Sequence, residues 1–387
     1  MSRDPKCPIR VMRLIARMNI GGPAVQVSGL MRGLNSVEFD HRLYTGFCAV
    51  DEADYLDSVA TDVEAIRIEG LGRHVSFSGD IKAFVFLVKA IRDFKPDIIH
   101  THTAKAGFLG RIASLVSFQK SIRVHTFHGH LLNGYFGSFK RLLVVIAEKS
   151  LATITSQLLA VGDKVREDLL KAGIGKKEKF GLIPPGLEIG ILPLKSESKA
   201  FYALNNNRLQ CAFIGRITQI KRPDRFLDVV SEIKTRDINL DFFIAGDGEL
   251  LEACRKRITA EELPVVVLGW QSNIERVLSA ADIVLLTSDN EGTPLSLIQA
   301  GMAGLPVVTT NVGSVSEVVL NNVTGIITEL DVQQIANALE NLANNNAARA
   351  QLGKSAQEFT LANFGVQRLV HDHEELYKRL LSSPAKS

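Results

Sequence analysis

Short apolar runs alternate with longer segments of helical period along the whole chain. A buried strand reads as a short continuous apolar run, whereas an amphipathic helix repeats its apolar residues every three or four positions. Strands that alternate with helices are typical of βα units and a mostly parallel sheet. Both halves show this pattern, which predicts two Rossmann-like α/β domains with doubly wound parallel sheets. The expected strands span 9–15, 41–47, 97–101, 122–126, 158–161 and 179–183, then 209–214, 240–245, 265–268, 282–286, 306–309 and 325–328.

One interruption separates the two halves. Prolines, glycines and an asparagine run break both periodicities between Pro184 and Asn207. We therefore predict an N-terminal domain over residues 1–185 and a C-terminal domain over 186–365, and a length of 387 residues suits two domains. A last helix is expected over 366–383, and its apolar stripe must dock on a partner surface.

The composition is that of an ordinary globular protein, and it excludes several classes of function. The formal charge is +3, from 45 Lys and Arg against 42 Asp and Glu, without a contiguous basic block. A nucleic-acid surface is therefore not expected. The four cysteines stand far apart without a Cys-x-x-Cys pair, which is typical of a reduced compartment. Charges interrupt the first 22 residues and every long apolar stretch, so we expect a cytoplasmic chain that does not span a membrane.

The most informative segment is residues 287–301, which follows the expected strand 282–286. Thr293 stands at a natural N-cap and Pro294 at the first helical position, where its missing N–H costs nothing. A helix that starts at the edge of a cleft suits a diphosphate or sugar hydroxyls. Glu291 lies before this helix and Gln299 about 1.5 turns inside it, so the two could contact different parts of one elongated ligand. A plain βα turn with a solvated glutamate is the alternative.

A second segment, residues 215–223, places cations after the first strand of the second half. Arg216 and Lys221 flank a loop that opens a helix near Pro223, where the helix dipole also favours an anion. A phosphate group is the natural ligand for such a loop. The alternative is a basic loop that is merely solvated.

Two glycine loops follow expected strands. Gly21 and Gly22 allow the backbone to approach a ligand before a helix starts, whereas Gly246-Asp247-Gly248 lacks a third glycine. Neither loop is a Gly-x-Gly-x-x-Gly fingerprint, so a nicotinamide enzyme is weakly supported, and tight-turn geometry alone is the alternative. The chain has no Gly-x-Ser-x-Gly and no phosphate-binding loop ending in Gly-Lys-Ser/Thr, which argues against hydrolase triads and P-loop phosphotransfer.

Histidines gather in one part of the first half. No cysteine or carboxylate completes a zinc set at the usual spacing, and no Asp-x-Asp pair is present to hold a divalent cation, so we expect no metal. One or two of the imidazoles should face the cleft, whereas His125 should pack structurally. His371 and His373 are expected on the solvated face of the last helix. The clustered histidines are His100, His102, His125, His128 and His130.

The stretch Tyr135–Ile146 joins aromatic residues, two cations and a dense apolar run. This combination is typical of a segment at a membrane interface. A core-packed helix with a basic start is the alternative of equal weight.

In combination these motifs resemble the retaining glycosyltransferases of the GT-B fold, specifically the large family 4 that includes bacterial capsule, O-antigen and lipid glycosylating enzymes. The resemblance covers nearly the whole chain and depends on the order and spacing of its motifs. They are Gly21-Gly22, the Pro-Asp-Ile-Ile-His-Thr-His run at 96–102, His128-Gly129, Gly215-Arg216 with Lys221, Gly246-Asp247-Gly248, Ala281-Asp282, and Glu291-Gly292-Thr293-Pro294 with Ala300.

The resemblance implies the fold and the roles of particular residues. The two domains would face a central cleft, with the last helix packing back on the first domain. Arg216 and Lys221 would neutralise the donor diphosphate, Glu291 would bind hydroxyls of the donor sugar, and His128 would lie beside the transferred sugar. The implied donor-binding residues are Gly22, Gly215, Arg216, Lys221, Gly246, Gly248, Glu291, Gly292, Thr293, Pro294, Leu295 and Gln299, and the acceptor side would have Gly21, Gly22, His102 and His130.

The chain departs from the family pattern at Gln299. The family has a second glutamate there, seven residues after the first, which accepts hydrogen bonds from the ribose hydroxyls. A glutamine can still accept through its amide oxygen, but it brings no charge. The departure therefore affects donor affinity or nucleotide preference more than the transfer chemistry.

The function implied is retaining transfer of a hexose or N-acetylhexosamine from a nucleotide-diphosphate sugar, by family frequency a UDP-sugar. The acceptor would be a hydroxyl of a lipid-linked or cell-surface glycan, and neither a metal nor a cofactor would be needed. Such an enzyme would serve polysaccharide biosynthesis for the cell envelope, as a cytoplasmic protein with peripheral contact to the inner membrane. The alternatives are a GT-B-like sugar-nucleotide epimerase or hydrolase, and a non-catalytic sugar-nucleotide binder.

Overall fold

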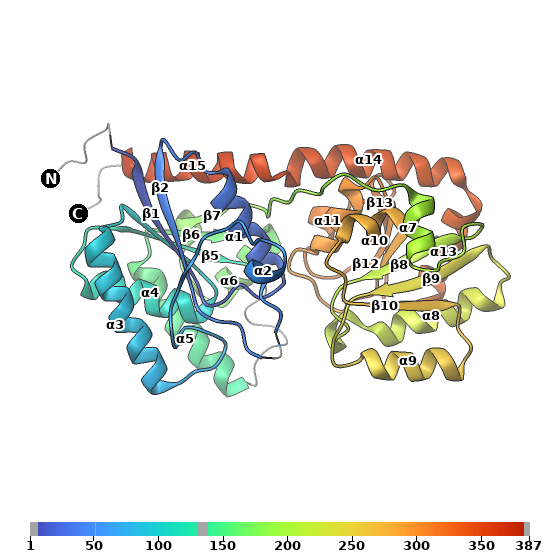
Figure 1. Cartoon of the computed structure of the whole chain (residues 1–387), viewed down its shortest axis with the longest axis horizontal. Coiled ribbons are helices and arrows are strands. Elements are labelled where there is room, and N and C mark those ends of the chain that lie inside the picture. Colours follow the sequence, from blue (N-terminus) through green and yellow to red (C-terminus); the bar gives the residue numbers. More distant parts are fainter. Residues whose placement is uncertain (1–6, 51, 130–137, 383–387) are drawn as a thin grey trace. The chain divides into compact units, whose positions relative to one another are not determined.

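The computed structural model describes residues 7–50, 52–129 and 138–382. The chain forms two compact units (Figure 1). Unit 1 comprises Met1–Leu187 and Val366–Ser387, and unit 2 comprises Glu188–Gly365. Each unit is a parallel sheet with helices, as the alternating pattern predicted.

Unit 1 contains a seven-stranded sheet in the order β3-β2-β1-β4-β5-β6-β7, with all neighbouring strands parallel. Its central strands are largely buried because both faces of a parallel sheet are covered, and β1 and β4 bury polar residues, among them Arg13, His100 and His102, together with apolar ones. The register sets the last residues of β1, β2 and β4 side by side, with Ile15 opposite both Thr45 and His102. The strands are β1 (Ile9–Ile15), β2 (Phe39–Thr45), β3 (Ile66–Arg67), β4 (Ile98–His102), β5 (Ile122–Phe127), β6 (Gln157–Ala160) and β7 (Phe180–Leu182).

The helices of unit 1 include the last helix of the chain. Helix α15 buries Leu369, Val370, Leu376 and Tyr377 in a core shared with β1, β2 and α1, and Figure 1 shows this red helix beside the blue strands. Its apolar stripe therefore stabilises a domain whose other residues lie far away in the sequence. The helices are α1 (Gly22–Gly33), α2 (Tyr55–Ser58), α3 (Phe77–Phe94), α4 (Ala104–Val116), α5 (Ser138–Ile154), α6 (Asp163–Lys171), α15 (Val366–Ser382) and the 3₁₀ helix η1 (Lys177–Lys179).

Unit 2 contains a six-stranded parallel sheet in the order β10-β9-β8-β11-β12-β13. The strands are β8 (Leu209–Ile214), β9 (Leu240–Ala245), β10 (Val265–Gly269), β11 (Ile283–Leu286), β12 (Val307–Thr310) and β13 (Gly325–Thr328). The helices are η2 (Gln219–Lys221, 3₁₀), α7 (Lys195–Phe201), α8 (Pro223–Thr235), α9 (Leu251–Ala260), α10 (Ile274–Ala280), α11 (Leu295–Met302), α12 (Val315–Val318), α13 (Val332–Asn344) and α14 (Asn346–Phe364).

Three local features differ from the sequence prediction. Strand β2 begins at Phe39, two residues before the expected start, because Phe39 is buried in the core. Strand β3 was not predicted, since a two-residue pairing leaves no apolar run to recognise. Helix α11 begins at Leu295 with Pro294 as its N-cap, so Thr293 lies one position before the cap and makes no capping hydrogen bond.

Candidate functional site

The predicted donor residues of unit 2 lie in loops at the carboxyl edge of its sheet. Four adjacent strands, β9, β8, β11 and β12, end there, and open parallel sheets bind their ligands at this edge. The loop after β8 carries Arg216 and Lys221, and the loop after β11 carries Glu291. The strand order, which the sequence does not display, therefore brings these two loops together.

Lys221 and Glu291 form an ion pair. The Lys221 Nζ atom lies 2.6 Å from Oε1 of Glu291, and the two side chains are 17% and 8% exposed. The hydroxyl of Ser288 donates a second hydrogen bond to the same oxygen, at 2.5 Å. The sequence prediction placed these residues at one ligand, and the structure shows in addition that each neutralises the other.

The backbone of Glu291 is held by the loop after β12. The Ser314 N–H donates to the Glu291 carbonyl at 3.0 Å, and a Cβ added to Gly313, which has φ +54°, would lie 1.9 Å from that oxygen. The Thr310 hydroxyl donates to the Ser288 carbonyl at 2.7 Å. The end of β12 and the loop after it therefore hold the backbone of residues 288–291, whereas Lys221 binds the Glu291 carboxylate.

A second ionic cluster, which the sequence reasoning missed, ties the same two loops together. Arg222 and Arg225 both bind the Asp289 carboxylate, at 3.1 and 2.7 Å. Arg225 also donates to the Thr287 carbonyl at 2.7 Å, and the Asp289 N–H donates to the Ile220 carbonyl at 2.9 Å. From the sequence, Arg222 and Arg225 at the start of α8 could have predicted such a cluster, because cations at this position pair with carboxylates of a neighbouring loop.

Several other predicted donor residues of unit 2 belong to the same two loops or to α11. Arg216 is exposed, and no carboxylate among the described residues forms an ion pair with it. The hydroxyl of Thr293 is buried and makes no hydrogen bond within the described structure, and it stands next to Gly292 and before Pro294 and Leu295 at the start of α11. Gln299 lies in the second turn of α11 and is partly exposed.

Gly246 and Gly248 have a structural reason for being glycine. A Cβ on Gly246, where φ is +155°, would lie 1.8 Å from the Gly215 carbonyl oxygen, and one on Gly248 would lie 2.5 Å from that of Ile217. The loops after β8 and β9 can pack this closely only without these side chains. Tight packing alone thus explains both glycines, and a role in donor binding stays a prediction.

In unit 1 the predicted glycines open helix α1. Gly21 is the N-cap, Gly22 is the first helical residue, and no side chain caps this helix. A Cβ on Gly21 would meet no atom closer than 4.0 Å. The first amides of α1 are therefore reachable at the carboxyl end of β1, as expected for a loop that approaches a ligand.

The histidines of unit 1 form a connected network. His102 Nδ1 lies 2.8 Å from His128 Nε2, and Nη1 of the buried Arg13 lies 3.4 Å from both His102 Nε2 and His100 Nδ1. The Tyr377 hydroxyl lies 2.6 Å from His100 Nδ1. Four elements, β1, β4, α15 and the segment after β5, thus contribute to one polar cluster in an otherwise apolar core.

Burial keeps these imidazoles neutral. Desolvation is the main cause that lowers the pKa of His128 and of His373 to about 3, and it lowers the pKa values of His100, His102 and His125 well below 6.5. The charge of Arg13 lowers the pKa values of His100, His102 and His373 further.

One histidine prediction is wrong, and another lies outside the described residues. His373 is buried, and its Nδ1 lies 2.8 Å from the Leu369 carbonyl oxygen, because that face of α15 packs on unit 1. His371 is exposed. His125 is buried against Phe127 and lies 2.8 Å from the Thr101 hydroxyl. His130 belongs to the part of the chain that the structure does not describe. Within the described part, no three His, Cys, Asp or Glu side chains are grouped to hold a metal ion.

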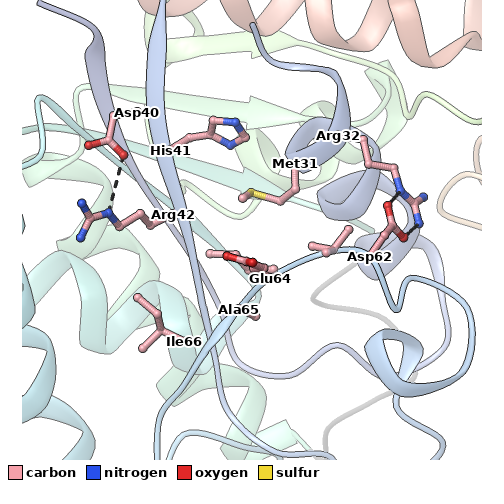
Figure 2. A pocket seen from close by; sticks show the side chains of 11 residues that line it. Met31, Arg32, Asp40, His41, Arg42, Asp62, Glu64, Ala65 and Ile66 are labelled. Atoms are coloured by element: carbon pink, nitrogen blue, oxygen red, sulfur yellow. Dashed lines mark hydrogen bonds and ion pairs between the residues drawn. The ribbon is translucent and has the colours of Figure 1, made fainter. Parts of the chain in front are cut away.

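A separate pocket of about 650 Å³ lies on unit 1 between the end of α1, β2 and the segment before β3. Figure 2 shows Met31, His41 and Glu64 among its lining residues, with the Arg32–Asp62 ion pair at one side. Because this pocket contains none of the predicted site residues, it is not part of the candidate site.

Comparisons with known proteins agree with this arrangement. Residues 20–190 match the model described as Glycosyltransferase Family 4, and residues 195–359 match that of Glycosyl transferases group 1. The chain is therefore a glycosyltransferase of the GT-B type. The family 4 match lies in unit 1 except for its last three residues, and the group 1 match lies within unit 2.

Particular relatives cover most of the chain. An Escherichia coli UDP-Gal:alpha-D-GlcNAc-diphosphoundecaprenol alpha-1,3-galactosyltransferase is 28% identical and is aligned over 84% of this chain and 85% of its own length. Staphylococcus aureus CapM, a capsular polysaccharide biosynthesis glycosyltransferase, is 23% identical over 83% and 86%. The crystal structure of Anabaena HepE in complex with UDP and glucose superposes with a TM-score of 0.81 at 19% identity, covering 96% of this chain and 100% of that one.

Proposed function

We propose that this glycosyltransferase moves a hexose or N-acetylhexosamine from a UDP-sugar to a hydroxyl of a lipid-linked glycan, with retention of the anomeric configuration. The observation that carries the proposal is the Lys221–Glu291 pair at the carboxyl edge of the sheet of unit 2, in the two loops that also carry the exposed Arg216 and lead into α11. The galactosyltransferase relative is named for a UDP-sugar donor and a diphosphoundecaprenol acceptor. A structural neighbour has been crystallised with UDP-glucose.

Cations and amides would hold the donor. Arg216 and Lys221 would bind the diphosphate together with the first amides of α11, so that positive charge comes from the protein and no metal is needed. Glu291 would accept hydrogen bonds from hydroxyls of the sugar while Lys221 shifts its contact partly to phosphate. His128 would donate a hydrogen bond to the transferred sugar, and Gln299 would accept one from the ribose.

The proposed reaction breaks the bond between the anomeric carbon and the phosphate oxygen, whose electron pair stays on the departing UDP. The acceptor oxygen bonds to the oxocarbenium-like carbon on the same face, and its proton passes to the departing phosphate. Catalysis would be mainly electrostatic, because fixed cations stabilise the charge that develops on the leaving group. The acceptor approaches from the side that the diphosphate leaves, which accounts for retention.

We further propose that the enzyme works at the surface of an anionic membrane, where a lipid-linked acceptor is found. None of the helices within the described residues is long and apolar enough to cross a bilayer. Helix α3 instead exposes Phe77, Ile81 and Val85 together with the cations Lys82 and Lys89. In α5, part of the segment 135–146 considered from the sequence, Leu142, Leu143 and Ile146 are exposed, while residues 130–137 are not described.

Replacing Lys221 by alanine tests the proposed function. We expect this variant to lose UDP-sugar transfer to a polyprenyl-diphosphate-linked sugar by a factor of about 10² or more, since a charge that stabilises the transition state is removed. Release of UDP and formation of glycosylated lipid are measured in the presence of EDTA, with Lys234→Ala on the exposed side of α8 as the control. Near-normal turnover would contradict the assignment.

Two further measurements make this test specific. Because Lys221→Ala leaves the buried Glu291 carboxylate without its cation, folding is checked by thermal unfolding, and the Lys221→Ala/Glu291→Gln double variant removes the leftover charge.

A wild-type enzyme that releases UDP from the donor at the same rate without any acceptor would be a hydrolase, and one that only binds UDP-sugars would be a non-catalytic binder. Either result overturns the proposed transfer.

A further inference from the structure

Arg13 is a fully buried cation among uncharged partners. No carboxylate of the described residues forms an ion pair with it, and its Nε and Nη2 atoms have no hydrogen-bond partner there. Arg111, which is also fully buried in unit 1, is in contrast paired with Glu148 at 2.8 Å. Since an uncompensated buried charge is costly, the position of Arg13 calls for a function other than stability.

The chemistry of arginine fixes the protonation of the imidazoles beside it. A guanidinium has only donors and does not lose its proton in proteins. The nitrogens that Arg13 Nη1 approaches, His102 Nε2 and His100 Nδ1, must therefore be acceptors without hydrogen. A neutral imidazole with one bare nitrogen carries its proton on the other. His102 is consequently protonated at Nδ1, and His100 at Nε2.

The same logic extends from His102 to His128. The protonated Nδ1 of His102 lies 2.8 Å from His128 Nε2 and donates to it. His128 Nε2 is then an acceptor, so a neutral His128 carries its proton on Nδ1. We propose that Arg13 and His102 are positioning residues that fix His128 in its Nδ1–H tautomer, through the chain Arg13 Nη1 to His102 to His128.

This inference rests on the proposed function and makes the role of His128 more specific. With Nε2 engaged by His102, the Nδ1–H group is the part of the ring left to meet a ligand. His128 would therefore act as a hydrogen-bond donor to an oxygen of the bound donor sugar, and it would not act as a general base. This agrees with a mechanism in which the departing phosphate takes the acceptor proton.

Helix α15 anchors the other branch of the network. The Tyr377 hydroxyl lies 2.6 Å from His100 Nδ1, and the Thr126 hydroxyl lies 2.7 Å from His100 Nε2. His100 also stacks on His102, with ring centroids 4.4 Å apart. The branch thus holds the His102 ring in the orientation that serves His128.

The tautomers can be observed directly by nitrogen NMR of the full chain labelled with ¹⁵N-histidine at neutral pH. The expected spectrum has His128 and His102 protonated at Nδ1 and His100 at Nε2, with signals assigned through His128→Gln and His102→Gln variants. In Arg13→Met we expect His102, and through it His128, to become a mixture of tautomers. A wild-type His128 protonated at Nε2, or an unchanged His128 signal in Arg13→Met, would overturn the proposal.

Kinetics provides a second readout. His102→Leu, which can neither accept nor donate, should lower kcat about 10- to 100-fold with a smaller change in KM, as when a group that orients a functional imidazole is removed. His102→Gln can accept from Arg13 and donate to His128, so it should recover much of this loss. The exposed His371→Gln is the control, and thermal unfolding verifies that each variant is folded.

The two proposals fail separately. If no UDP-sugar is transferred but the spectrum shows the expected tautomers, the proposed function is wrong and the relay stands. If transfer is normal in His102→Leu, the relay is wrong and the proposed function stands.

Discussion

At the scale of single residues, Glu291 depends on neighbours from three loops. Its carboxylate is bound by Lys221 and Ser288, and its carbonyl accepts from the Ser314 amide. The resemblance to family 4 predicted Glu291 and Lys221 as site residues, but it gave no sign that they are paired. The glycine at 313 is equally necessary, because only a residue without Cβ leaves room for the Glu291 carbonyl.

Gly313→Ala should therefore affect the site through two effects. A non-glycine residue is strained at this positive φ, and its Cβ would also clash with the Glu291 carbonyl. The added Cβ would lie 1.9 Å from the Glu291 carbonyl oxygen, so the loop must move and carry the carboxylate with it. We expect loss of UDP-sugar binding, measured by titration calorimetry, and a free energy of unfolding lower by more than ~2 kcal/mol.

Gly304→Ala is the matched control. Gly304 has a similar positive φ of +72°, but its nearest neighbour would lie 3.8 Å from the new Cβ. This variant should lose only about 1 kcal/mol of stability and bind the donor normally. Equal binding by both variants would show that the loop after β12 does not hold Glu291.

At the scale of elements, helix α3 buries one face and exposes another that is both apolar and cationic. Ala83, Leu87 and Ile91 belong to the core of unit 1, while Phe77, Ile81 and Val85 are exposed. The helical period predicted the element, but the period alone does not tell which apolar residues reach the core. Only the packing of α3 against the sheet and α4 leaves this second apolar face uncovered.

The exposed face of α3 should bind anionic vesicles. We expect the chain to float with vesicles rich in phosphatidylglycerol and less with neutral ones, and binding should weaken as salt is raised. The Ile81→Ser/Val85→Ser variant should lose about 10-fold in vesicle affinity because apolar burial is lost. Leu361→Ser, an exposed leucine of α14 in unit 2, is the control. Flotation that is independent of lipid charge would contradict this placement.

At the scale of the whole molecule, the two units differ sharply in their histidines. All nine histidines belong to unit 1, and unit 2 has none. In six of them the folded state lowers the pKa: His41, to about 4, the partly buried His128, and the buried His100, His102, His125 and His373. The two units should consequently respond differently to acid.

Unit 1 should lose stability as the pH falls below about 6.5. The unfolded histidines bind protons near that pH, whereas the lowered pKa values keep the folded ones neutral, so the unfolded state binds more protons in this window. The free energy of unfolding then decreases by about 1.4 kcal/mol per pH unit for each such histidine. The stabilisation that unit 1 gains from these neutral histidines is fully present above pH 6.5, and it decreases as the pH falls from 6.5 through 5.

Hydrogen exchange of the full chain measures both units in one sample. Peptides from β4 and β5 should lose protection between pH 6.5 and 5 after correction for intrinsic exchange, while peptides from β8 and β9 should keep theirs. Equal loss in both units would show that carboxylates, which both units contain, dominate the acid response.

The sequence by itself determined the elements of the fold and the identity of the family motifs. The expected strands 9–15 and 209–214 match β1 and β8, because a strand covered on both faces is mostly apolar even where it also buries a polar residue such as Arg13. Strand β3 escaped prediction because it consists of one short pairing with β2. The period of the apolar residues and the positions of turn-forming residues depend only on residues close in the sequence, so strands, helices and turns can be predicted from them.

Only the tertiary structure decided which polar groups meet. Arg13 lies 87 residues from His100 in the sequence, and Lys221 lies 70 residues from Glu291, and neither pairing has a sequence period. His373 was expected in solvent because charged residues surround it in the sequence, yet the docking of α15 buries it. Strand order and helix docking set these contacts, and both result from burial of apolar surface over the whole domain.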